Sequence, residues 1–479
     1  MYEYGNLIAG QSRPGTGEVF ETRNPARPSE VVGRYTGASA AEVVEAVKAA
    51  SAAQKKWRRL PSVERAARVE KFILAIEAKT NELAQAITLE QGKPLAESLD
   101  EIAKACAESR FMIGEGARSH SPAMPSSRAG FNNTVLRRPR GVIAALTPWN
   151  FPIMTPMRKI APALVFGNSV ILKPSEYTPA AACIVGAAAK DILPDGLLQI
   201  VLGMAVVGQA LVSHPEVDAI TFTGSVPVGK KIYAAASQNL TEVALELGGK
   251  NAAIVHDTED MDGCLDQIIG AAFQCAGQRC TGISRVIVQA SLETQVLDGL
   301  ARRAQALMLG DGAQAGITMG PLNNAAQFKK VAAMVEAGVA EGAQVRTGGK
   351  AVTVAGAEGG YFYEPTILAN VTPAMSVATE EIFGPVISVL SYQTLDEAFE
   401  ILNDVEFGLT SSFFSNDHAV IQRFIAESES GMLHVNHGTI PENHMPFGGI
   451  KHSGVGAYSV GPSAANFFTT EHAVYVKAA

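Results

Sequence analysis

Residues 141–175, GVIAALTPWNFPIMTPMRKIAPALVFGNSVILKPS, decide the fold class of this chain. Two short apolar runs, GVIAALTP (141–148) and SVILKPS (169–175), flank a longer stretch with a helical pattern. Three further apolar runs follow: LLQIVLG (197–203), AITFTGS (219–225) and EVALELGG (242–249). Apolar runs that alternate with helical segments are typical of parallel strands buried on both faces of a sheet. The pattern predicts a doubly wound α/β domain whose ligands bind at the carboxyl ends of its strands.

A second series of strands and helices follows this domain. Its apolar runs, between residue 250 and about residue 440, are AAIVHD, SRVIVQA, PVISVLSY, LTSSFFS and GMLHVNHG. Because the alternation restarts here, we place a domain boundary near Gly248–Gly249. Upstream, Ser39 and Glu42 have the spacing of a helix capping box, so the N-terminal part is expected to form helices that cover the first sheet.

Two segments fit neither domain: SPAMPSSRAGFNNTVLRRPR (121–140) and ANFFTTEHAVYVKAA (465–479). Each has the pattern of an extended arm. An open strand edge usually pairs with another strand. We expect these arms to mediate oligomerisation, and the alternative is that they pair as strands within one subunit.

Composition excludes several classes of protein. The chain has 479 residues, 47% apolar and 18% charged, with a net charge of -8, so it is long enough for about three folded domains and is not disordered. It has no block of basic residues, which argues against a nucleic-acid partner. No apolar stretch reaches the roughly 18 residues that span a bilayer, and the N-terminus lacks a signal-peptide pattern. We therefore expect a soluble, cytoplasmic protein with no membrane partner.

The five cysteines suggest either thiol chemistry or packing. So few cysteines in so long a chain do not form a disulfide framework. The C-x4-C spacing of Cys275 and Cys280 lacks a second ligand pair, so no metal site is predicted. Cys280 has small neighbours and Arg279 beside it, which suits a reactive thiol, although most cysteines are buried and inert.

Two polar residues at strand ends suit the chemistry of such a thiol. Asn150, in TPWNFP (147–152), follows the first strand of the series, and its amide could donate to a developing oxyanion. The alternative is a structural turn bounded by prolines. Glu246, in LELGGK (245–250), ends an apolar strand, where a carboxylate is costly to bury without a role or an ion pair.

Glycine-rich turns suggest a nucleotide site. VLGMAVVG and FTGSVPVG each follow a strand and open a helix, where backbone N–H groups can bind phosphate. Lys173 and Glu176, in LKPSE, lie where a ribose could bind. An acidic residue there favours NAD and repels the extra phosphate of NADP. The alternative for Glu176 is a favourable charge at a helix N-terminus.

Taken together, TPWNFP, LKPSE, FTGS, LELGGK, GQRC, EEIFGPV and PFGGIKHSG occur in this order over almost the whole chain. In this respect the chain resembles the aldehyde dehydrogenase superfamily. The resemblance implies an α/β fold with a Rossmann-type doubly wound NAD-binding domain (1–120 and 141–248) and a second α/β catalytic domain (249–442). It also implies a β-arm for oligomerisation (121–140 and 463–479), an active-site loop returning toward the NAD-binding domain (443–462), and assembly as homodimers or homotetramers.

The resemblance also implies roles for individual residues. Cys280 matches the nucleophile, Glu246 the general base and Asn150 the oxyanion donor beside the backbone N–H of Cys280. Glu246 favours hydrolysis to a free acid, since coenzyme A-acylating members typically lack this base. The cofactor is expected to be NAD, with NADP as the alternative. The matched cofactor positions are Thr147, Pro148, Trp149, Lys173, Ser175, Glu176, Gly208, Phe222, Gly224, Ser225, Val228, Leu247, Gly248, Glu381 and Phe383.

Arg158 suggests a substrate with an acidic group. It stands where semialdehyde dehydrogenases have a similar residue, and a guanidinium there would pair with a carboxylate or sulfonate. The alternative is a surface arginine on a helix. Gln274 replaces a second arginine typical of succinate-semialdehyde dehydrogenases. The full set of expected substrate contacts is Arg158, Phe151, Gln274, Arg279, Thr281, Phe447 and Ser453.

These residues predict NAD-dependent oxidation of a small anionic aldehyde, similar to succinate semialdehyde, to its acid through a cysteine thioester. Alternative substrates are 2-oxoglutarate semialdehyde, sulfolactaldehyde and lactaldehyde or glycolaldehyde. Two other classes stay open: a coenzyme A-acylating enzyme and a catalytically silent relative. After PFGGIKHSG, residues Gly456-Ala457-Tyr458 replace the usual Gly-Arg-Glu, so the acid often proposed as a proton outlet is missing.

Overall fold

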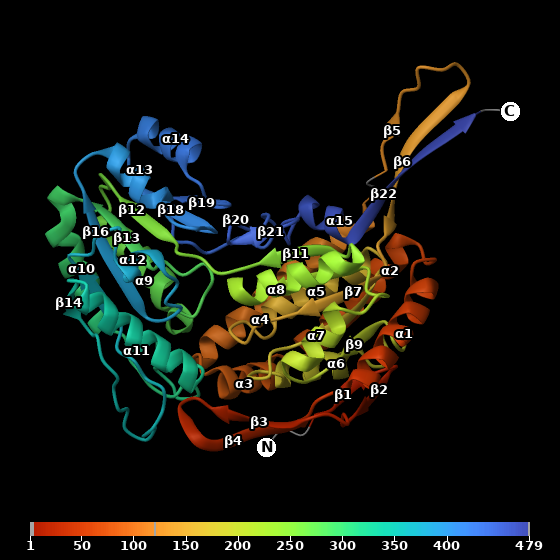
Figure 1. Ribbon diagram of the computed structural model, residues 1–479, viewed down its shortest axis with the longest axis horizontal. Coiled ribbons are helices and arrows are strands. Elements are labelled where there is room, and N and C mark those ends of the chain that lie inside the picture. The colour runs from red at the N-terminus through yellow and green to blue at the C-terminus, as the bar shows by residue number, and fades with distance from the viewer. Residues whose placement is uncertain (1–3, 119–120, 478–479) are drawn as a thin grey trace.

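The computed structural model describes residues 4–118 and 121–477, which form two large sheets with helices on both faces of each, and an arm (Figure 1). The first sheet has the strand order β2-β1-β9-β8-β7-β10-β11-β21. The five central strands run parallel, and each lies within one of the apolar runs that the sequence indicated. The strands of this sheet are β1 (Asn6–Ile8), β2 (Gln11–Arg13), β7 (Val142–Leu146), β8 (Ser169–Lys173), β9 (Leu198–Ile200), β10 (Ala219–Thr223), β11 (Glu242–Glu246) and β21 (Gly454–Val455).

Two groups of helices cover this sheet, which makes it doubly wound as predicted. The capping box of Ser39 and Glu42 is present at the start of the first helix, so this local prediction is confirmed. One face packs against α2 (Ser62–Glu77), α3 (Thr80–Gln91), α4 (Leu95–Ala117), α5 (Met154–Val165) and α6 (Ala180–Ala189). The other face packs against α1 (Ala40–Trp57), α7 (Ala205–Val212) and α8 (Val226–Ala236).

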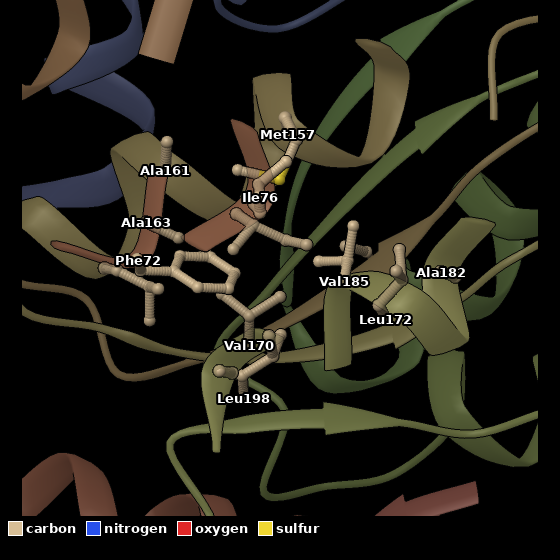
Figure 2. Close-up of a cluster of buried hydrophobic side chains, with 14 of the residues drawn as sticks. Phe72, Ile76, Met157, Ala161, Ala163, Val170, Leu172, Ala182, Val185 and Leu198 are labelled. Carbon is tan, nitrogen blue, oxygen red and sulfur yellow. The ribbon is translucent and has the colours of Figure 1, made fainter. Parts of the chain in front are cut away.

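The core on the first of these faces joins distant parts of the chain. Figure 2 shows Phe72 and Ile76 from α2 beside Met157 from α5 and the strand residues Val170 and Leu198. These side chains are at most 3% exposed. Burying large apolar side chains removes their surface from water, which is the dominant favourable term in folding. The N-terminal helices are therefore an integral part of the first domain.

The second sheet has the order β14-β15-β16-β13-β12-β18-β19, and all its pairs are parallel except β14 with β15. Its strands are β12 (Ala252–Val255), β13 (Arg285–Gln289), β14 (Gln344–Thr347), β15 (Thr366–Ala369), β16 (Val386–Tyr392), β18 (Thr410–Phe414) and β19 (Met432–Val435). Its helices are α9 (Met261–Phe273), α10 (Glu293–Gln305), α11 (Ala325–Ala340), α12 (Ser376–Thr379), α13 (Leu395–Asn403) and α14 (His418–Glu427). The predicted boundary at Gly248–Gly249 lies between β11 of the first sheet and β12 of the second.

Smaller elements complete the body of the molecule. The strand β21, from the segment 443–462, pairs with β11, so the C-terminal part of the chain returns to the first sheet. The remaining strands are β3 (Val19–Asn24) with β4 (Arg27–Thr36), and β17 (Phe407–Gly408) with β20 (Ile450–Lys451). Short 3-10 helices occur at η1 (Ser237–Asn239), η2 (Gln274–Gly277) and η3 (Ala290–Leu292).

The two predicted arm segments pair with each other within this chain. A three-stranded sheet of β5 (Ala123–Met124), β6 (Phe131–Pro139) and β22 (Thr469–Lys477) points away from the body at the upper right of Figure 1. The prediction of an extended segment is wrong for residues 465–468, which belong to helix α15 (Pro462–Phe468). This helix buries its alanines and phenylalanines and contacts α4 and α5. Residues 1–3, 119–120 and 478–479, parts of the predicted domain and arm, lie outside the described residues.

Within residues 4–118 and 121–477, the structure contains no helix long and apolar enough to cross a membrane.

The core contact of Figure 2 gives a test of how α2 contributes to stability. Phe72 is fully buried, whereas Leu74 on the same helix is 53% exposed. We expect Phe72→Ala to lower the free energy of unfolding by about 3–5 kcal/mol, because it leaves a cavity in the core. Leu74→Ala, the matched control, should change it by well under half of that amount. Urea unfolding followed by fluorescence measures both, and equal effects would show that α2 does not pack as described.

Candidate active site

The carboxyl ends of β7, β10 and β11 and the loop before β13 line one cavity of about 250 Å³. This is the location that a doubly wound sheet predicts for a ligand. The cavity brings together most of the residues that the sequence singled out: Pro148, Trp149, Asn150, Phe151, Arg158, Gly224, Ser225, Glu246, Leu247, Gly248, Gln274, Arg279, Cys280, Thr281, Glu381, Phe383 and Phe447.

Cys280 lies on a tight loop that holds its thiol at the cavity. Cys275, Ala276 and Gly277 take the left-handed backbone conformation in succession, with φ values of 57°, 52° and 71°. A Cβ on Gly277 would come within 2.1 Å of the carbonyl oxygen of Gly384, so only glycine fits there. Gln278 fixes the loop, because its side chain donates to the carbonyl of Cys275 at 2.9 Å and accepts from the N–H of Asn323 at 2.9 Å.

The protonation state of Cys280 depends on its surroundings. Burial, together with the nearby charge of Glu246, raises the pKa of the thiol to about 11. The positive charges of Arg158 and Arg279 oppose this shift. In the free protein the group is therefore a thiol at neutral pH, and it must lose its proton before it can act as a nucleophile.

Hydrogen bonds to both the side chain and the backbone carbonyl of Asn150 orient this residue. Its side-chain Nδ2 donates to the carbonyl of Gln278 at 2.9 Å, which places the amide directly beside the cysteine loop. One of the two amide hydrogens is used in this way, and the other is available to an oxygen bound near Cys280. The backbone carbonyl of Asn150 accepts from Nζ of Lys93 at 2.8 Å. The position is thus suited to an oxyanion donor.

A buried ion pair that the sequence analysis missed holds the loop of Asn150. Lys93 contacts Glu101 at 2.6 Å, and both side chains are 1% exposed. Glu101 also accepts from the backbone N–H groups of Ile153 and Met154 at 2.9 and 3.0 Å. The ammonium of Lys93 lies 4.1 Å from the ring centroid of Phe151. Both residues belong to EQGKPLAESLDE (90–101), which we call the connector segment, between α3 and the first turns of α4.

The connector segment also contacts the cysteine loop. Gln91 donates to Sγ of Cys275 at 3.3 Å, and the N–H of Cys275 donates to Glu97 at 2.9 Å. Burial raises the pKa of Cys275 to about 12 and that of Glu97 to about 7. Cys275 is 1% exposed, so it packs below the loop and is no second nucleophile. One segment thereby holds both loops that supply groups to the site.

Glu246 presents an unused carboxylate oxygen at the cavity. Its Oε2 accepts from the hydroxyl of Thr223 at 3.0 Å, whereas its buried Oε1 has no hydrogen-bond partner. A buried acceptor without a partner is costly unless a ligand or water completes it. The nearby Lys159 donates to the hydroxyl of Thr221 at 2.9 Å, and burial lowers its pKa to about 8. The geometry suits a base that accepts a proton from water.

Arg158 lines the cavity but is not a free guanidinium, because it already pairs with an acid. Its Nε and Nη2 donate to the two carboxylate oxygens of Glu108 at 2.8 and 2.7 Å. Its guanidinium also lies 4.1 Å from the ring centroid of Phe447. Sequence reasoning missed Glu108, which lies 50 residues earlier on α4. The pKa of Arg158 is raised by this carboxylate against the opposing effect of burial.

Unlike Arg158, Arg279 has no acidic partner and forms no ion pair within the described residues 4–118 and 121–477. It donates to Gln274 and, at 3.0 Å, to the hydroxyl of Thr281, while its Nε is buried without a partner. Burial lowers its pKa from the ordinary value of 12.5. The side chain is 6% exposed. A cation without a counter-ion beside Cys280 is an attractive position for an anionic group of a ligand.

The predicted substrate contact of Ser453 is wrong. Its side chain is fully buried and is absent from the residues that line the cavity. The hydroxyl donates to the carbonyl of Gly248 at 2.7 Å and accepts from the N–H of Gly408 at 3.0 Å. The first contact holds the loop after Glu246 and the second joins Ser453 to β17, so Ser453 has a structural position.

The other end of the cavity has groups that fit a nicotinamide and its ribose. Trp149 and Phe383 meet edge to face with ring centroids 5.6 Å apart. Glu381 accepts from the N–H of Gly249 at 3.1 Å through Oε1, which leaves Oε2 available as an acceptor. Burial raises the pKa of Glu381. The hydroxyl of Thr147 is buried without a partner, as expected for an atom that a bound ligand completes.

The remaining predicted cofactor residues extend from the cavity along the same edge of the sheet. Lys173 lies 3.7 Å from Glu176, and Gly208 leaves space against the Lys173 side chain, where a Cβ would be at 3.5 Å. Gly224 precedes α8, whose N-cap Ser225 makes no side-chain capping bond. The residues therefore fit a dinucleotide. Those that do not line the cavity itself are Thr147, Lys173, Ser175, Glu176, Gly208, Phe222 and Val228.

The cavity thus brings a thiol, an oriented amide and a carboxylate with one unpartnered oxygen beside a strand edge of the dinucleotide-binding type, as in an enzyme site. The aldehyde dehydrogenase family model matches residues 12–474. The chain belongs to the aldehyde dehydrogenase family and is an oxidoreductase that acts on aldehydes.

Curated relatives cover nearly the whole chain. The alpha-ketoglutaric semialdehyde dehydrogenase of Bacillus subtilis (strain 168) is 37% identical over 99% of this chain and 98% of its own length. The 3-sulfolactaldehyde dehydrogenase of Pseudomonas putida is 37% identical over 92% of this chain and 90% of its own. The mitochondrial succinate-semialdehyde dehydrogenase of Arabidopsis thaliana is 37% identical over 92% and 83%.

Solved structures agree with the fold. An aldehyde dehydrogenase from Brucella melitensis biovar abortus 2308 matches with a TM-score of 0.96 and 34% identity, covering 100% of this chain and 98% of that one. Betaine aldehyde dehydrogenase from Staphylococcus aureus in complex with NAD+ matches with a TM-score of 0.96 and 30% identity, covering 99% and 94%. The predicted α/β architecture with a Rossmann-type domain is confirmed.

The raised pKa of Cys280 gives a prediction about its reactivity. Without cofactor or substrate, inactivation by iodoacetamide should accelerate about tenfold per pH unit and level off only near the pKa of about 11, because only the thiolate reacts. Residual activity after timed exposure measures the rate, and mass spectrometry should locate the label on Cys280 but not on the buried Cys275. A rate that levels off near neutral pH would contradict the predicted environment.

Proposed function

We propose that this protein is an NAD-dependent dehydrogenase that oxidises a short aldehyde with a single acidic group to the corresponding acid. The observation that carries the substrate class is Arg279, a buried cation without an acidic partner in the cavity wall next to Cys280. An arginine of this kind would pair with a carboxylate or sulfonate at the far end of a short substrate.

The names of the relatives support this substrate class. The aldehydes they name, alpha-ketoglutaric semialdehyde, 3-sulfolactaldehyde and succinate semialdehyde, each carry one carboxylate or sulfonate. We propose a semialdehyde of four or five carbons as the substrate of this protein, with sulfolactaldehyde as the alternative. Gln274 and Thr281, which bind Arg279, would hold its guanidinium in place for the acidic group.

In the proposed mechanism the Cys280 thiol first loses its proton to water, the thiolate sulfur then attacks the aldehyde carbon, and the electron pair of the carbonyl π bond moves to the oxygen, which becomes an oxyanion. The free amide hydrogen of Asn150 and the backbone N–H of Cys280 stabilise this oxyanion. Bound NAD supplies a hydride acceptor for the tetrahedral carbon. Trp149 and Phe383 would hold the nicotinamide end of the cofactor. The reacting carbon would then lie between Cys280 and the nicotinamide. Loss of the hydride leaves a thioester on Cys280 and restores the carbonyl.

Glu246 would complete the reaction by hydrolysis. Its unpartnered Oε1 accepts a proton from water, the water oxygen attacks the thioester carbon, and the Cys280 thiolate leaves as the acid forms. The presence of this base favours water over coenzyme A as the acyl acceptor. We also propose NAD over NADP, because Glu176 at the end of β8 would repel a phosphate on the adenosine ribose.

We also propose that the chain assembles as a dimer or tetramer through the sheet of β5, β6 and β22. The outer edge of β22 is open in this sheet, and Tyr475 and Val476 on it are 72% and 51% exposed. Open strand edges with apolar side chains favour pairing with another chain.

Arg279→Gln tests the proposed substrate class. We expect kcat/KM for succinate semialdehyde to fall about 10- to 100-fold, mainly through KM, because the variant removes the charge that binds the acidic group. Propanal, which has no acidic group, should change less than about threefold. Steady-state NADH formation measures both, and the product should be the free acid without added coenzyme A. Equal losses for the two aldehydes, or dependence on coenzyme A, would overturn the proposal.

A further inference from the structure

The substrate half of the cavity contains two arginines, and one acid contacts the first of them directly. Arg158 and Arg279 both line it, and Glu108 lines it beside Arg158. The side chains of Arg158 and Glu108 are only 8% and 3% exposed. Because water screens charges weakly at such sites, each of these three charges acts strongly on a bound ligand.

The pair of Arg158 and Glu108 has a fixed geometry. Two parallel bonds of 2.8 and 2.7 Å join the guanidinium to both carboxylate oxygens. Phe447 packs against the guanidinium at 4.1 Å and fixes its plane. Bidentate arginine–carboxylate pairs are among the strongest side-chain contacts, so this pair holds the Glu108 carboxylate in place. Three N–H groups of Arg158 have no hydrogen-bond partner in the described part of the chain and can still donate to a ligand.

The other acids of the cavity have different surroundings. Glu101 pairs with Lys93, and Asp100 pairs with Lys104 at 2.7 Å. Burial raises the pKa of Glu97 to about 7, so it is only partly charged at neutral pH, and it accepts from the N–H of Cys275. Glu246 belongs to the catalytic end of the cavity and Glu381 to its nicotinamide end, and the side chain of Glu442 is 72% exposed to solvent. Glu108 is thus the acid that offsets one of the two arginine charges and leaves one positive charge for the substrate.

We propose that Glu108 is a specificity-determining residue that restricts the enzyme to aldehydes with one negative charge and excludes those with two. One anionic group can be shared by Arg279 and the free edge of Arg158. A doubly charged group in the same place would meet the carboxylate of Glu108 without enough positive charge to balance it. This inference rests on the proposed function, since it concerns the acidic group of the same substrate.

Two aldehydes of the same shape can separate charge from size. In 3-sulfopropanal and 3-phosphonopropanal, a tetrahedral acidic group follows the same carbon chain. The sulfonate carries one negative charge, and at weakly alkaline pH the phosphonate carries two. The ratio of their kcat/KM values therefore measures charge selectivity. Substitution of a residue with only a structural role would lower both values and leave this ratio unchanged.

For Glu108→Gln we expect the phosphonate-to-sulfonate ratio of kcat/KM to rise about 10- to 100-fold, because removal of one negative charge leaves both arginine charges available. Glu108→Asp, which keeps the charge, should keep the ratio of the natural protein within about threefold even if its overall rate falls. Arg158→Gln should shift the ratio in the opposite direction to Glu108→Gln.

Glu77→Gln is the matched control, because Glu77 forms a similar two-bond pair with Arg110 away from the cavity. It should leave the ratio unchanged. If Glu108→Gln lowers the rates for both aldehydes equally, Glu108 only positions Arg158 and the inference is wrong. If Glu108→Gln does not fold, an unchanged ratio in Arg158→Gln overturns the inference. Failure of the proposed function itself has a different signature: the natural protein would prefer propanal to both anionic aldehydes.

Discussion

The buried ion pair of Lys93 and Glu101 is the interaction on which the geometry of the site depends. Asn150 follows a strand of the first sheet, and Cys280 precedes a strand of the second, so nothing in either sheet alone sets the distance between them. Lys93 and Glu101 hold the loop of Asn150 through its carbonyl and two N–H groups. The same connector segment contacts the cysteine loop at Cys275. An ion pair buried this deeply is unfavourable unless further hydrogen bonds satisfy its charged groups, and here the loop of Asn150 supplies them.

The charged residues of the cavity form two groups, one at its catalytic end and one at its substrate end. At the catalytic end, burial and Glu246 keep Cys280 protonated in the free protein, and the unpartnered oxygen of Glu246 is available to accept a proton. At the substrate end, Glu108 occupies Arg158 while Arg279 has no acid beside it. The usual acid after PFGGIKHSG is replaced by Tyr458. Lys159, whose pKa burial lowers to about 8, lies near Glu246.

The sequence predicted the parts of the molecule that depend on local pattern. The five central strands of the first sheet, five of the seven strands of the second, the capping box at Ser39 and the motif residues of the cavity could be read from it, since each depends on short stretches of chain. It did not predict Glu108, Lys93 or Glu101, because these residues of the connector segment and helix α4 contact residues 150–158 from 50 or more positions away in the chain. Ser453 and the helix at 462–468 were misjudged because a motif match and an alternating pattern do not reveal burial.

The most direct test of this account replaces Lys93 and Glu101 together by methionine, which removes both charges without leaving one of them buried alone. The rate of NADH formation in the first turnover, with saturating NAD and aldehyde, reports the step that the oxyanion donors assist. The account predicts that this rate falls about 100-fold, the loss expected when an oxyanion donor is misplaced, in a protein that keeps its thermal stability. A folded double variant with an unchanged first-turnover rate would contradict it.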